Sequence, residues 1–320
     1  MDTRQDRLKT AQPRLPAQLL RIAATLLGVA LALVAAPATK AADPLPAGVQ
    51  SGFVDAGHGV RIHYLEAGAA ASPDHASQKP SLLFIPGWTM PAWIWEPQTE
   101  YFSKAFHVVA IDPRSQGEST HTDDANSPEI RAADIQAVIE DRKLAPVVLI
   151  GWSQGVADVL AYVDRFGQKN VAGLVLVDGL AGFDFDAGMA QAFMGIYSRL
   201  LKDRDAYTRG FVKSMFKSTQ SDEYISRLTA AAEQTPTAAT LAESVSMIAI
   251  DRRPTLGKIS VPTLIVTPKG GFTASFEEDM QKHVANSQIE EMENVGHALF
   301  VDDPKAFNHR LEIFLQPLSK

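Results

Sequence analysis

A serine between two glycines is the clearest chemical feature of this sequence. Residues 147–157 read Val-Val-Leu-Ile-Gly-Trp-Ser-Gln-Gly-Val-Ala, so Ser153 lies where an apolar run ends and a helical pattern begins. A Gly-x-Ser-x-Gly pattern that joins a strand to a helix is typical of a nucleophile elbow, because Gly151 and Gly155 leave room for so tight a turn. The turn projects the hydroxyl from the edge of the sheet, and the following helix N-terminus favours developing negative charge. We therefore predict that Ser153 is a nucleophile rather than only a helix N-cap.

Composition limits the other chemistry that is available. The chain has 320 residues and no cysteine, which excludes disulfides, thiolate nucleophiles and Cys-ligated metals. Its formal net charge of −7 offers no basic face for phosphates, so nucleic acid is not an expected partner. A hydrophobic fraction of 46% is ordinary for a globular protein with a large core.

The N-terminus has the pattern of a secretory signal peptide. Five basic residues precede the uncharged apolar run Ile22–Ala36, and Thr39-x-Ala41 provides a small-x-small cleavage site. We expect residues 1–42 to be removed from an exported, periplasmic or secreted protein with no stable membrane insertion afterwards. An uncleaved anchor is the alternative, although the apolar run is shorter than the ~20 residues that a spanning helix needs.

The remaining chain, residues 43–320, alternates between strand-like and helical patterns. Val49–Glu66 predicts an edge hairpin around Gly57-His58-Gly59. Nearly continuous apolar runs, typical of strands buried on both faces, occur at Ser81–Ile85, His107–Ile111, Val147–Ile150 and Val171–Val177, and strand character returns at Thr263–Thr267 and Gln288–Met292. Helical patterns cover Ala92–Lys104, Pro128–Arg142, Gln154–Phe166 and Pro304–Leu315.

This alternation predicts an α/β fold with a mostly parallel twisted sheet and helices on both faces. Residues 182–253 show helical spacing without a strand-like run. We interpret them as a helical cap inserted between two strands. Its Met189, Phe193, Met194, Phe211, Met215 and Phe216 could line an apolar pocket or form the core of the cap.

Three stretches and their order resemble the α/β-hydrolase superfamily, in particular its cofactor-free haloperoxidases, perhydrolases and aryl esterases. They are the segment 84–97, which contains Phe-Ile-Pro-Gly-Trp-Thr-Met, the segment 108–119, Val-Val-Ala-Ile-Asp-Pro-Arg-Ser-Gln-Gly-Glu-Ser, and the elbow. With the late Gly296-His297, the similarity spans about residues 50–316.

The resemblance implies a base and an acid for Ser153. The superfamily order of nucleophile, acid and base, with the base after the last strand, selects His297 among the eight histidines. Relatives usually carry the acid after the next-to-last strand, but Gly271 stands at that place. Asp178, which ends the preceding strand run, is the preferred candidate because some members place their acid there. Glu277, Glu278 or Asp279, or no acid at all, are the alternatives left open.

The resemblance also implies an oxyanion hole and a supporting loop. One backbone N–H comes from Gln154, after the nucleophile, and the other from Trp88. Pro86 stands where relatives usually have histidine, which leaves the Trp88 donor in place. We interpret Asp112, Arg114 and Ser119 as scaffold rather than as chemical groups.

Together these residues predict an exported serine hydrolase that cleaves a small carboxylic ester through an acyl-enzyme on Ser153. No metal or organic cofactor is implied, and the expected partner is a small acyl substrate. Perhydrolysis, amide or aminopeptidase cleavage and carbon–carbon bond hydrolysis would use the same residues. Dehalogenase and epoxide hydrolase chemistry is disfavoured because those enzymes need Asp at the elbow. The alternative outside enzymes is a non-catalytic binding protein that lost its acid. The glycine at position 271, where relatives usually carry the acid, suggests this alternative.

Overall fold

The structure is a computed structural model. It describes residues 45–68, 79–122, 126–182, 184, 186–249 and 251–319. The predicted signal peptide falls on residues 1–42, outside the described residues. No helix in the described part of the chain is long and apolar enough to span a membrane.

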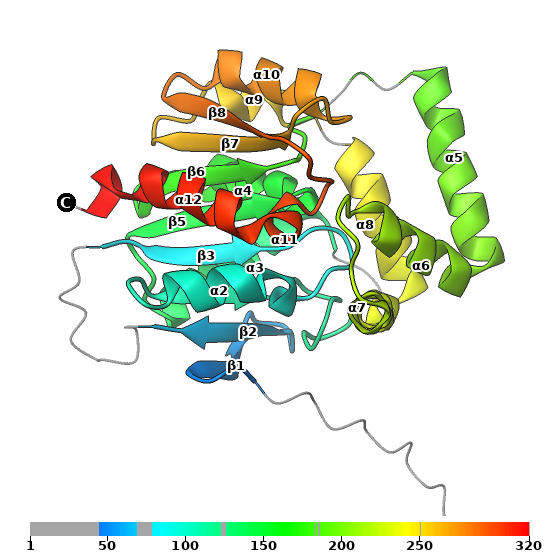
Figure 1. Cartoon of the computed structure of the whole chain (residues 1–320), viewed down its shortest axis with the longest axis horizontal. Coiled ribbons are helices and arrows are strands. Elements are labelled where there is room, and N and C mark those ends of the chain that lie inside the picture. The colour runs from blue at the N-terminus through cyan, green and yellow to red at the C-terminus, as the bar shows by residue number, and fades with distance from the viewer. Residues whose placement is uncertain are drawn as a thin grey trace, which may run out of the picture. The chain divides into compact units, whose positions relative to one another are not determined.

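An eight-stranded sheet forms the centre of the structure, with strand order β1-β2-β4-β3-β5-β6-β7-β8 (Figure 1). All pairings from β4 to β8 are parallel, and β2 pairs antiparallel with both β1 and β4. The strands are β1 Val49–Asp55, β2 Arg61–Ala67, β3 Ser81–Ile85, β4 Val108–Ile111, β5 Val147–Trp152, β6 Val171–Val177, β7 Thr263–Pro268 and β8 Ser287–Met292. The predicted fold class and the edge hairpin are confirmed.

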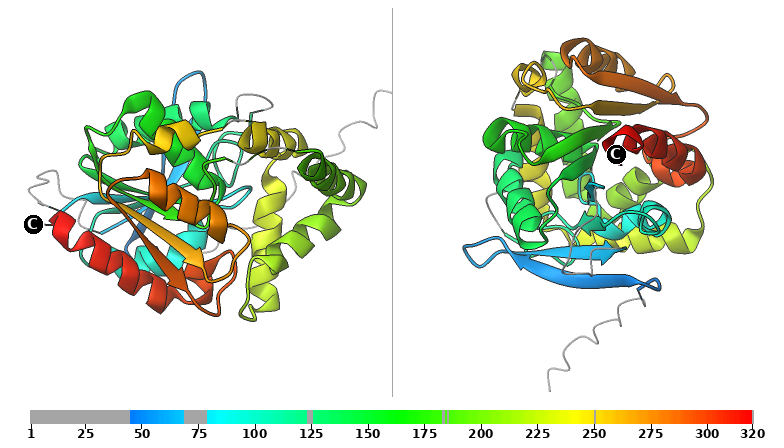
Figure 2. Two further views of the ribbon diagram at one scale, coloured as in Figure 1. Left: turned by 90° about the horizontal axis from the view of Figure 1, so that it is seen from above. Right: turned by 90° about the vertical axis from the view of Figure 1, so that its left-hand side faces the viewer.

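Helices cover both faces of this sheet, as the two views of Figure 2 show. One face carries α2 Glu96–Phe102, α11 Leu299–Asp302 and α12 Pro304–Leu315, and the other carries α3 Pro128–Asp141, α4 Gln154–Phe166, α9 Arg253–Leu256 and α10 Ala274–His283. A hydrophobic core lies on each face of the sheet, and alternate residues of β3 pack into each. Leu82 and Phe84 pack on one face, and Leu83 and Ile85 pack on the other. This two-sided burial explains the unbroken apolar runs in the sequence.

The segment expected as one helix over Ala92–Lys104 is divided. A 3-10 turn, η2 Ala92–Trp95, precedes α2, and Pro97 lies in the first turn of α2. Proline lacks an N–H and its fixed φ suits the first turn of a helix, so Pro97 favours the start of a new helix at this point. A second short 3-10 turn, η3 Pro317–Ser319, ends the described chain.

Of the five described helices between β6 and β7, the first four form a separate group: α5 Ala187–Lys202, α6 Arg204–Ser214, α7 Asp222–Gln234 and α8 Thr237–Ala249. Figure 1 shows them gathered beyond one end of the sheet. Asp186, Asp203 and Ser221 cap the first three of them, each accepting a hydrogen bond from a backbone N–H in the first turn. We call these four helices the cap.

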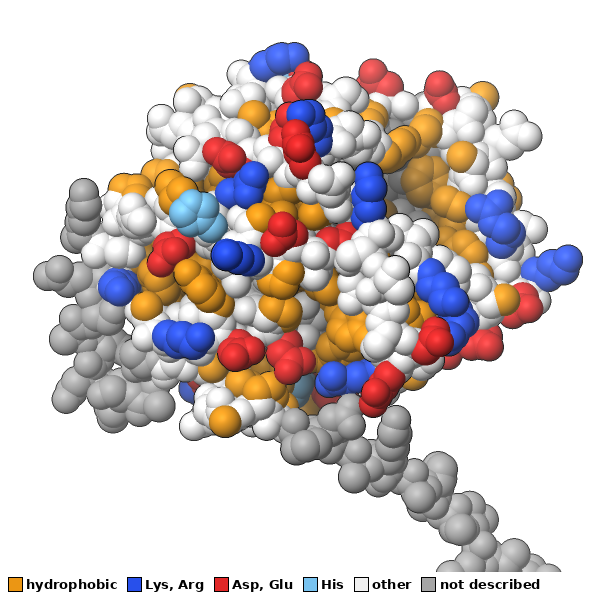
Figure 3. Space-filling view, in the orientation of Figure 1, with side chains coloured by type: hydrophobic (Ala, Val, Ile, Leu, Met, Phe, Trp, Pro, Cys, Tyr) orange, Lys and Arg blue, Asp and Glu red, His pale blue; other side chains and the backbone are white. Residues whose placement is uncertain are grey.

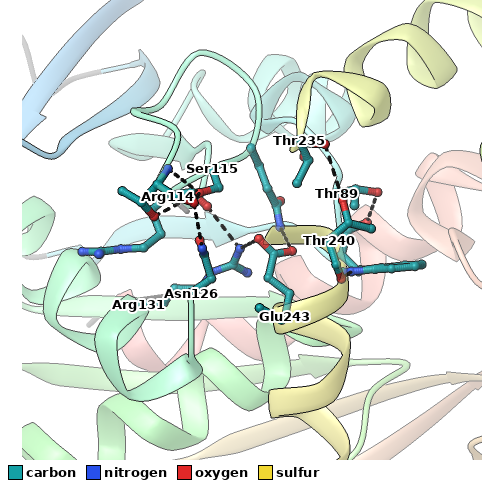
Figure 4. Close-up of polar contacts among 12 residues, drawn as sticks. Thr89, Arg114, Ser115, Asn126, Arg131, Thr235, Thr240 and Glu243 are labelled. Carbon is teal, nitrogen blue, oxygen red and sulfur yellow. Dashed lines mark hydrogen bonds and ion pairs between the residues drawn. The ribbon is translucent and has the colours of Figure 1, made fainter. Parts of the chain in front are cut away.

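A buried polar cluster joins the cap to the layer of helices beneath it. Glu243 of α8 accepts hydrogen bonds from Arg131 of α3 at 2.5 Å and from the Gln116 side chain at 3.2 Å. Arg131 also lies 3.7 Å from Asp158 of α4. Figure 4 shows Glu243 pointing from α8 toward Arg131 and its neighbours. Charged groups are rarely buried unless paired, so this cluster fixes where α8 can sit on the core.

Candidate active site

The chain makes a sharp, strained turn at Ser153, between β5 and α4. Ser153 has φ 57° and ψ −117°, a conformation that is rare for a residue with a side chain. A Cβ atom at Gly155 would lie 2.5 Å from the Ile85 carbonyl oxygen, and one at Gly151 would collide with the backbone of Gly155. The two glycines are therefore required by close backbone approach, as the sequence pattern predicts. Ser153 itself remains partly exposed at the end of the sheet.

Asp178 and His297 form a hydrogen bond beside this turn. His297 Nδ1 lies 2.6 Å from Asp178 Oδ2, and the Asp178 side chain is only 5% exposed. Asp178 follows β6, the strand next to β5, and the backbone N–H of Ser153 donates to the Val177 carbonyl at 2.9 Å. The acid candidate and the nucleophile candidate therefore lie on adjacent strand ends of one sheet.

The loop that carries His297 is held from two sides. The Trp152 indole donates a hydrogen bond of 2.9 Å to the His297 carbonyl, and the two rings lie 5.1 Å apart. Ala298 donates to the Met215 carbonyl of the cap at 2.9 Å, and a Cβ atom at Gly296 would lie 2.6 Å from that same oxygen. Glycine precedes His297 because cap backbone passes at this point.

The Ser153 hydroxyl makes no hydrogen bond to His297, nor to any other group in the described part of the chain. Nucleophile–base contacts are often long in structures without substrate and tighten when substrate binds. His297 Nε2 is the nitrogen left available for this contact, because Nδ1 is bound to Asp178.

The other carboxylates considered for the acid lie elsewhere. Glu278 is exposed, and the Asp279 carboxylate lies 3.6 Å from His283 Nδ1 on the outer face of α10. Glu277 is fully buried and faces Asp178 rather than His297. Asp178 is therefore the carboxylate that His297 contacts, although Gly271 occupies the place where relatives usually carry the acid.

Thr273 completes the surroundings of Asp178, and sequence reasoning did not identify it. Its hydroxyl donates a hydrogen bond to Asp178 Oδ1, so both carboxylate oxygens of Asp178 are engaged. Thr273 immediately precedes α10, in the segment after β7. A threonine before a helix is typical of an N-cap, and the packing of α10 against β7 and β8 places its hydroxyl beside Asp178 instead.

Two backbone N–H groups next to Ser153 have no acceptor. Neither Trp88 nor Gln154 donates its N–H to any group among the described residues, although both residues are buried. A Cβ atom at Gly87 would lie 3.0 Å from Ser153 Cβ, so the turn that carries Trp88 is close to the serine. Buried N–H groups rarely lack a partner, and a pair of them beside a nucleophile has the form of an oxyanion hole.

The Trp88 side chain connects this turn to the cap. Its indole donates to the Thr240 carbonyl of α8 at 2.9 Å, and its ring lies 5.3 Å from Phe211 of α6. A cavity of about 220 Å³, including its solvent-open part, lies here and is lined by residues that include Trp88, Leu200, Tyr207 and Phe211. Met215 is instead part of the main core, and Met194 is exposed on α5.

Asp112, Arg114 and Ser119 make structural contacts in the loop that follows β4. Asp112 accepts from His63 at 2.7 Å and from the backbone of Ala92 and Glu118. Arg114 pairs with Asp134 at 2.5 Å, and Ser119 donates to the Asp112 carbonyl at 2.6 Å. Figure 4 shows Arg114 in the polar layer beside Arg131. These bonds hold the loop after β4.

No cluster of three or more His, Cys, Asp or Glu side chains suited to a metal ion occurs within the described ranges. The groups brought together are a serine at a strained turn, a histidine–carboxylate pair and two free N–H groups. This combination suits nucleophilic attack on a carbonyl.

Comparison with known proteins places this geometry in a family. A family model described as "Alpha/beta hydrolase family" matches residues 82–310. A putative non-heme chloroperoxidase from Synechocystis sp. is 28% identical over 251 residues, which cover 73% of this chain and 91% of that protein. A bifunctional esterase/perhydrolase from Acinetobacter calcoaceticus is 32% identical over 130 residues, which cover 40% of this chain and 45% of that protein.

Two solved structures share the fold. An esterase from Exiguobacterium antarcticum has a TM-score of 0.75 at 23% identity, covering 83% of this chain and 100% of that one. A bromoperoxidase from Bacillus anthracis has a TM-score of 0.75 at 21% identity, with the same coverage. Because the family model spans more than half of the sequence and the sheet, elbow and helical layers agree with it, this chain belongs to the α/β hydrolase family.

Proposed function

We propose that this protein is a serine hydrolase that cleaves small carboxylic esters through an acyl-enzyme on Ser153. The observation that carries the proposal is the 2.6 Å bond between His297 Nδ1 and Asp178, formed beside a strained serine turn. That bond orients the imidazole and leaves Nε2 to accept the Ser153 proton. The same bond supports an enzyme over a binding protein without an acid.

In the proposed reaction, Ser153 Oγ attacks the ester carbonyl while His297 accepts its proton. The N–H groups of Trp88 and Gln154 hold the oxyanion, and His297 then protonates the departing alcohol. Water attacks the acyl-enzyme with His297 again as base, which releases the acid and restores Ser153. Asp178 stabilises the imidazolium in both halves.

The cavity between Trp88 and the cap supports an acyl group of modest size. Its lining combines apolar side chains, among them Leu200 and Phe211, with polar ones, among them Arg204. Figure 3 shows a hollow with hydrophobic side chains on the side of the molecule where α5 stands. Ligand sites are commonly concave and apolar with a few convergent polar groups.

A fluorophosphonate probe and a series of p-nitrophenyl esters of increasing acyl length test the proposal. We expect wild type to be labelled and to hydrolyse the short esters best, because the cavity is small. Ser153→Ala should lose both properties, and His297→Ala should lose rapid labelling. Hydrolysis that persists in Ser153→Ala, above the rate without protein, would contradict the proposal.

Perhydrolysis is a second candidate because the relative from Acinetobacter calcoaceticus is described as a bifunctional esterase/perhydrolase. In that reaction hydrogen peroxide, instead of water, attacks the acyl-enzyme. Assays with acetate or an ester in the presence of peroxide distinguish the two, since peracid formation should depend on Ser153 as well.

We also propose that the protein is exported. The support is the basic, apolar and small-residue order of residues 1–42. N-terminal sequencing of the protein purified from its native host should begin near Ala42 or Asp43, and an intact Met1 would contradict export with cleavage.

A further inference from the structure

A second buried carboxyl lies behind the Asp178–His297 pair and has no part in the proposed reaction. Glu277, in the first turn of α10, is 0% exposed. One of its oxygens, Oε1, accepts a hydrogen bond from the Gly179 N–H at 3.2 Å. Its other oxygen, Oε2, has no hydrogen-bond partner in the described part of the chain.

This contact falls on the turn that presents Asp178. Asp178 has φ 40°, in the left-handed region that residues with side chains rarely adopt. The next residue, Gly179, packs so tightly on the elbow that a Cβ atom there would lie 2.7 Å from the Ser153 carbonyl oxygen. The Asp178–Gly179 turn therefore packs directly against the Ser153 turn, and the hydrogen bond from Gly179 to Glu277 holds it in that place.

The first turn of α10 holds Asp178 at two points. Thr273 donates to the Asp178 carboxylate, and Glu277 accepts from the backbone directly after it. The two residues are themselves linked, because the Glu277 N–H donates to the Thr273 carbonyl at 3.1 Å. One helical turn thus positions both the side chain and the backbone of the acid.

Glu277 has one charged neighbour and two neutral polar ones. Asp178 is the charged group that faces it from the end of β6, while β7 and the start of α10 contribute the Thr267 and Thr273 hydroxyls. Burial, together with the nearby Asp178 carboxylate, raises the pKa of Glu277 to about 8. The His297 Nδ1 lies 2.6 Å from Asp178 Oδ2, and a proton on Glu277 avoids a second carboxylate charge beside that contact.

We propose that Glu277 is a positioning residue that, in its protonated form, holds the Asp178–Gly179 turn so that the one carboxylate charge faces His297. This inference rests on the proposed function, since it assigns Asp178 as the acid of that reaction. Loss of the Glu277 proton would place two carboxylates side by side in a buried site, and their repulsion would displace Asp178 from the imidazole.

Two substitutions of Glu277 distinguish the effect of its hydrogen bond to Gly179 from the effect of its protonation. Glu277→Gln keeps an oxygen for the Gly179 N–H but carries no charge at any pH. Glu277→Leu removes the acceptor and leaves that N–H buried without a partner. Glu278→Gln is the matched control, because Glu278 is the exposed neighbour on the same helix.

The first measurement is kcat and KM for a p-nitrophenyl ester from pH 6 to 10. We expect Glu277→Leu to lose about tenfold or more in kcat with little change in KM, and Glu277→Gln to restore part of that loss. Wild type and Glu278→Gln should lose kcat above about pH 8, whereas Glu277→Gln should retain it to higher pH. A Glu277→Gln profile that superimposes on that of wild type would overturn the inference.

The second measurement is the thermal midpoint of unfolding over the same pH range, which needs no turnover. Wild-type Glu277 binds a proton more tightly when folded, so its contribution to stability is lost as pH rises through about 8. The midpoint of Glu277→Gln relative to wild type should therefore rise with pH, and a difference that is constant with pH overturns the inference.

The Ser153→Ala variant shows whether a negative result contradicts the proposed function or only the role of Glu277. If Ser153→Ala still hydrolyses esters, the proposed function is wrong and the positioning role is wrong with it. If Ser153→Ala is inactive but the Glu277 variants match Glu278→Gln in both measurements, the proposed function stands and only the inference about Glu277 is wrong.

Discussion

At the scale of single residues, both oxygen-bearing groups of the site stand on strained backbone. Ser153 and Asp178 have φ values of 57° and 40°, each directly after a strand of the parallel sheet. Such conformations persist only where the surrounding structure holds them in place. In this chain the packing of Gly151 and Gly155 holds the first, and the contacts with Thr273 and Glu277 hold the second.

Asp178→Asn tests the acid at this scale. The amide retains the shape of the side chain but can stabilise the wrong tautomer of His297, so we expect kcat to fall by about 10³–10⁴-fold with little change in KM, as for a protease triad. Steady-state kinetics on a p-nitrophenyl ester provide the measurement. Asp279→Asn is the control and should behave as wild type, because the Asp279 carboxylate lies beside His283 on the outer face of α10. Equal rates in the two variants would exclude Asp178 from the mechanism.

At the scale of elements, the cap is attached to the core through buried charges as well as apolar packing. Burial raises the pKa of Glu243 to about 7 and that of Asp158 to about 6, and the Arg131 guanidinium opposes both shifts. These three groups come from α8, α4 and α3, so their pairing specifies how three helices meet. The Trp88–Thr240 bond adds a link from α8 to the turn beside Ser153.

Arg131→Met should destabilise the fold strongly. Methionine fills much of the same space but leaves Glu243 and Asp158 buried without their cation, which costs about 3–5 kcal/mol when one partner of a buried pair is removed. Urea unfolding gives the free energy of unfolding directly. Lys202→Met, at the exposed end of α5, is the control and should change stability by less than about 0.5 kcal/mol. Similar stabilities for the two variants would show that the cluster does not stabilise cap docking.

The elements themselves could be predicted from the sequence, but their mutual contacts could not. Nearly continuous apolar runs identified β3 to β6, because strands buried on both faces contain few polar residues, whereas β8, a largely polar edge strand, gave a weaker signal. Asp178 could be proposed because it ends one of these runs. The roles of Thr273 and Glu277 could not be predicted, since they depend on how α10 packs against β7 and β8. Arg131 and Glu243 are 112 residues apart, and no local pattern relates them.

At the scale of the whole molecule, we expect folding to depend on pH because burial raises the pKa of several carboxyls. The pKa values of Glu277, Glu243 and Asp158 are raised to about 8, 7 and 6, with burial as the largest cause for each. A carboxyl whose pKa is raised by folding binds more protons when folded. Its contribution to stability is therefore present below its unfolded pKa and is lost as pH rises through its folded pKa.

We accordingly expect the thermal midpoint of unfolding to fall as pH increases from about 5 to about 9. Differential scanning calorimetry across this range measures the slope. Glu243→Gln should reduce the slope near pH 7, because it removes one of these titrating groups while keeping an oxygen for Arg131. A midpoint that rises steadily over the same range would contradict this account.

The cap helices are not held to the core equally, and this difference determines which of them can accept substitutions. α8 is committed to the core by Glu243 and Thr240, whereas Leu200 is the single fully buried side chain of α5 and Met194 stays exposed. Substitutions along most of α5 therefore cost little folding free energy. Directed evolution toward new acyl groups should accumulate tolerated changes in α5 first, while α8 stays close to its present sequence.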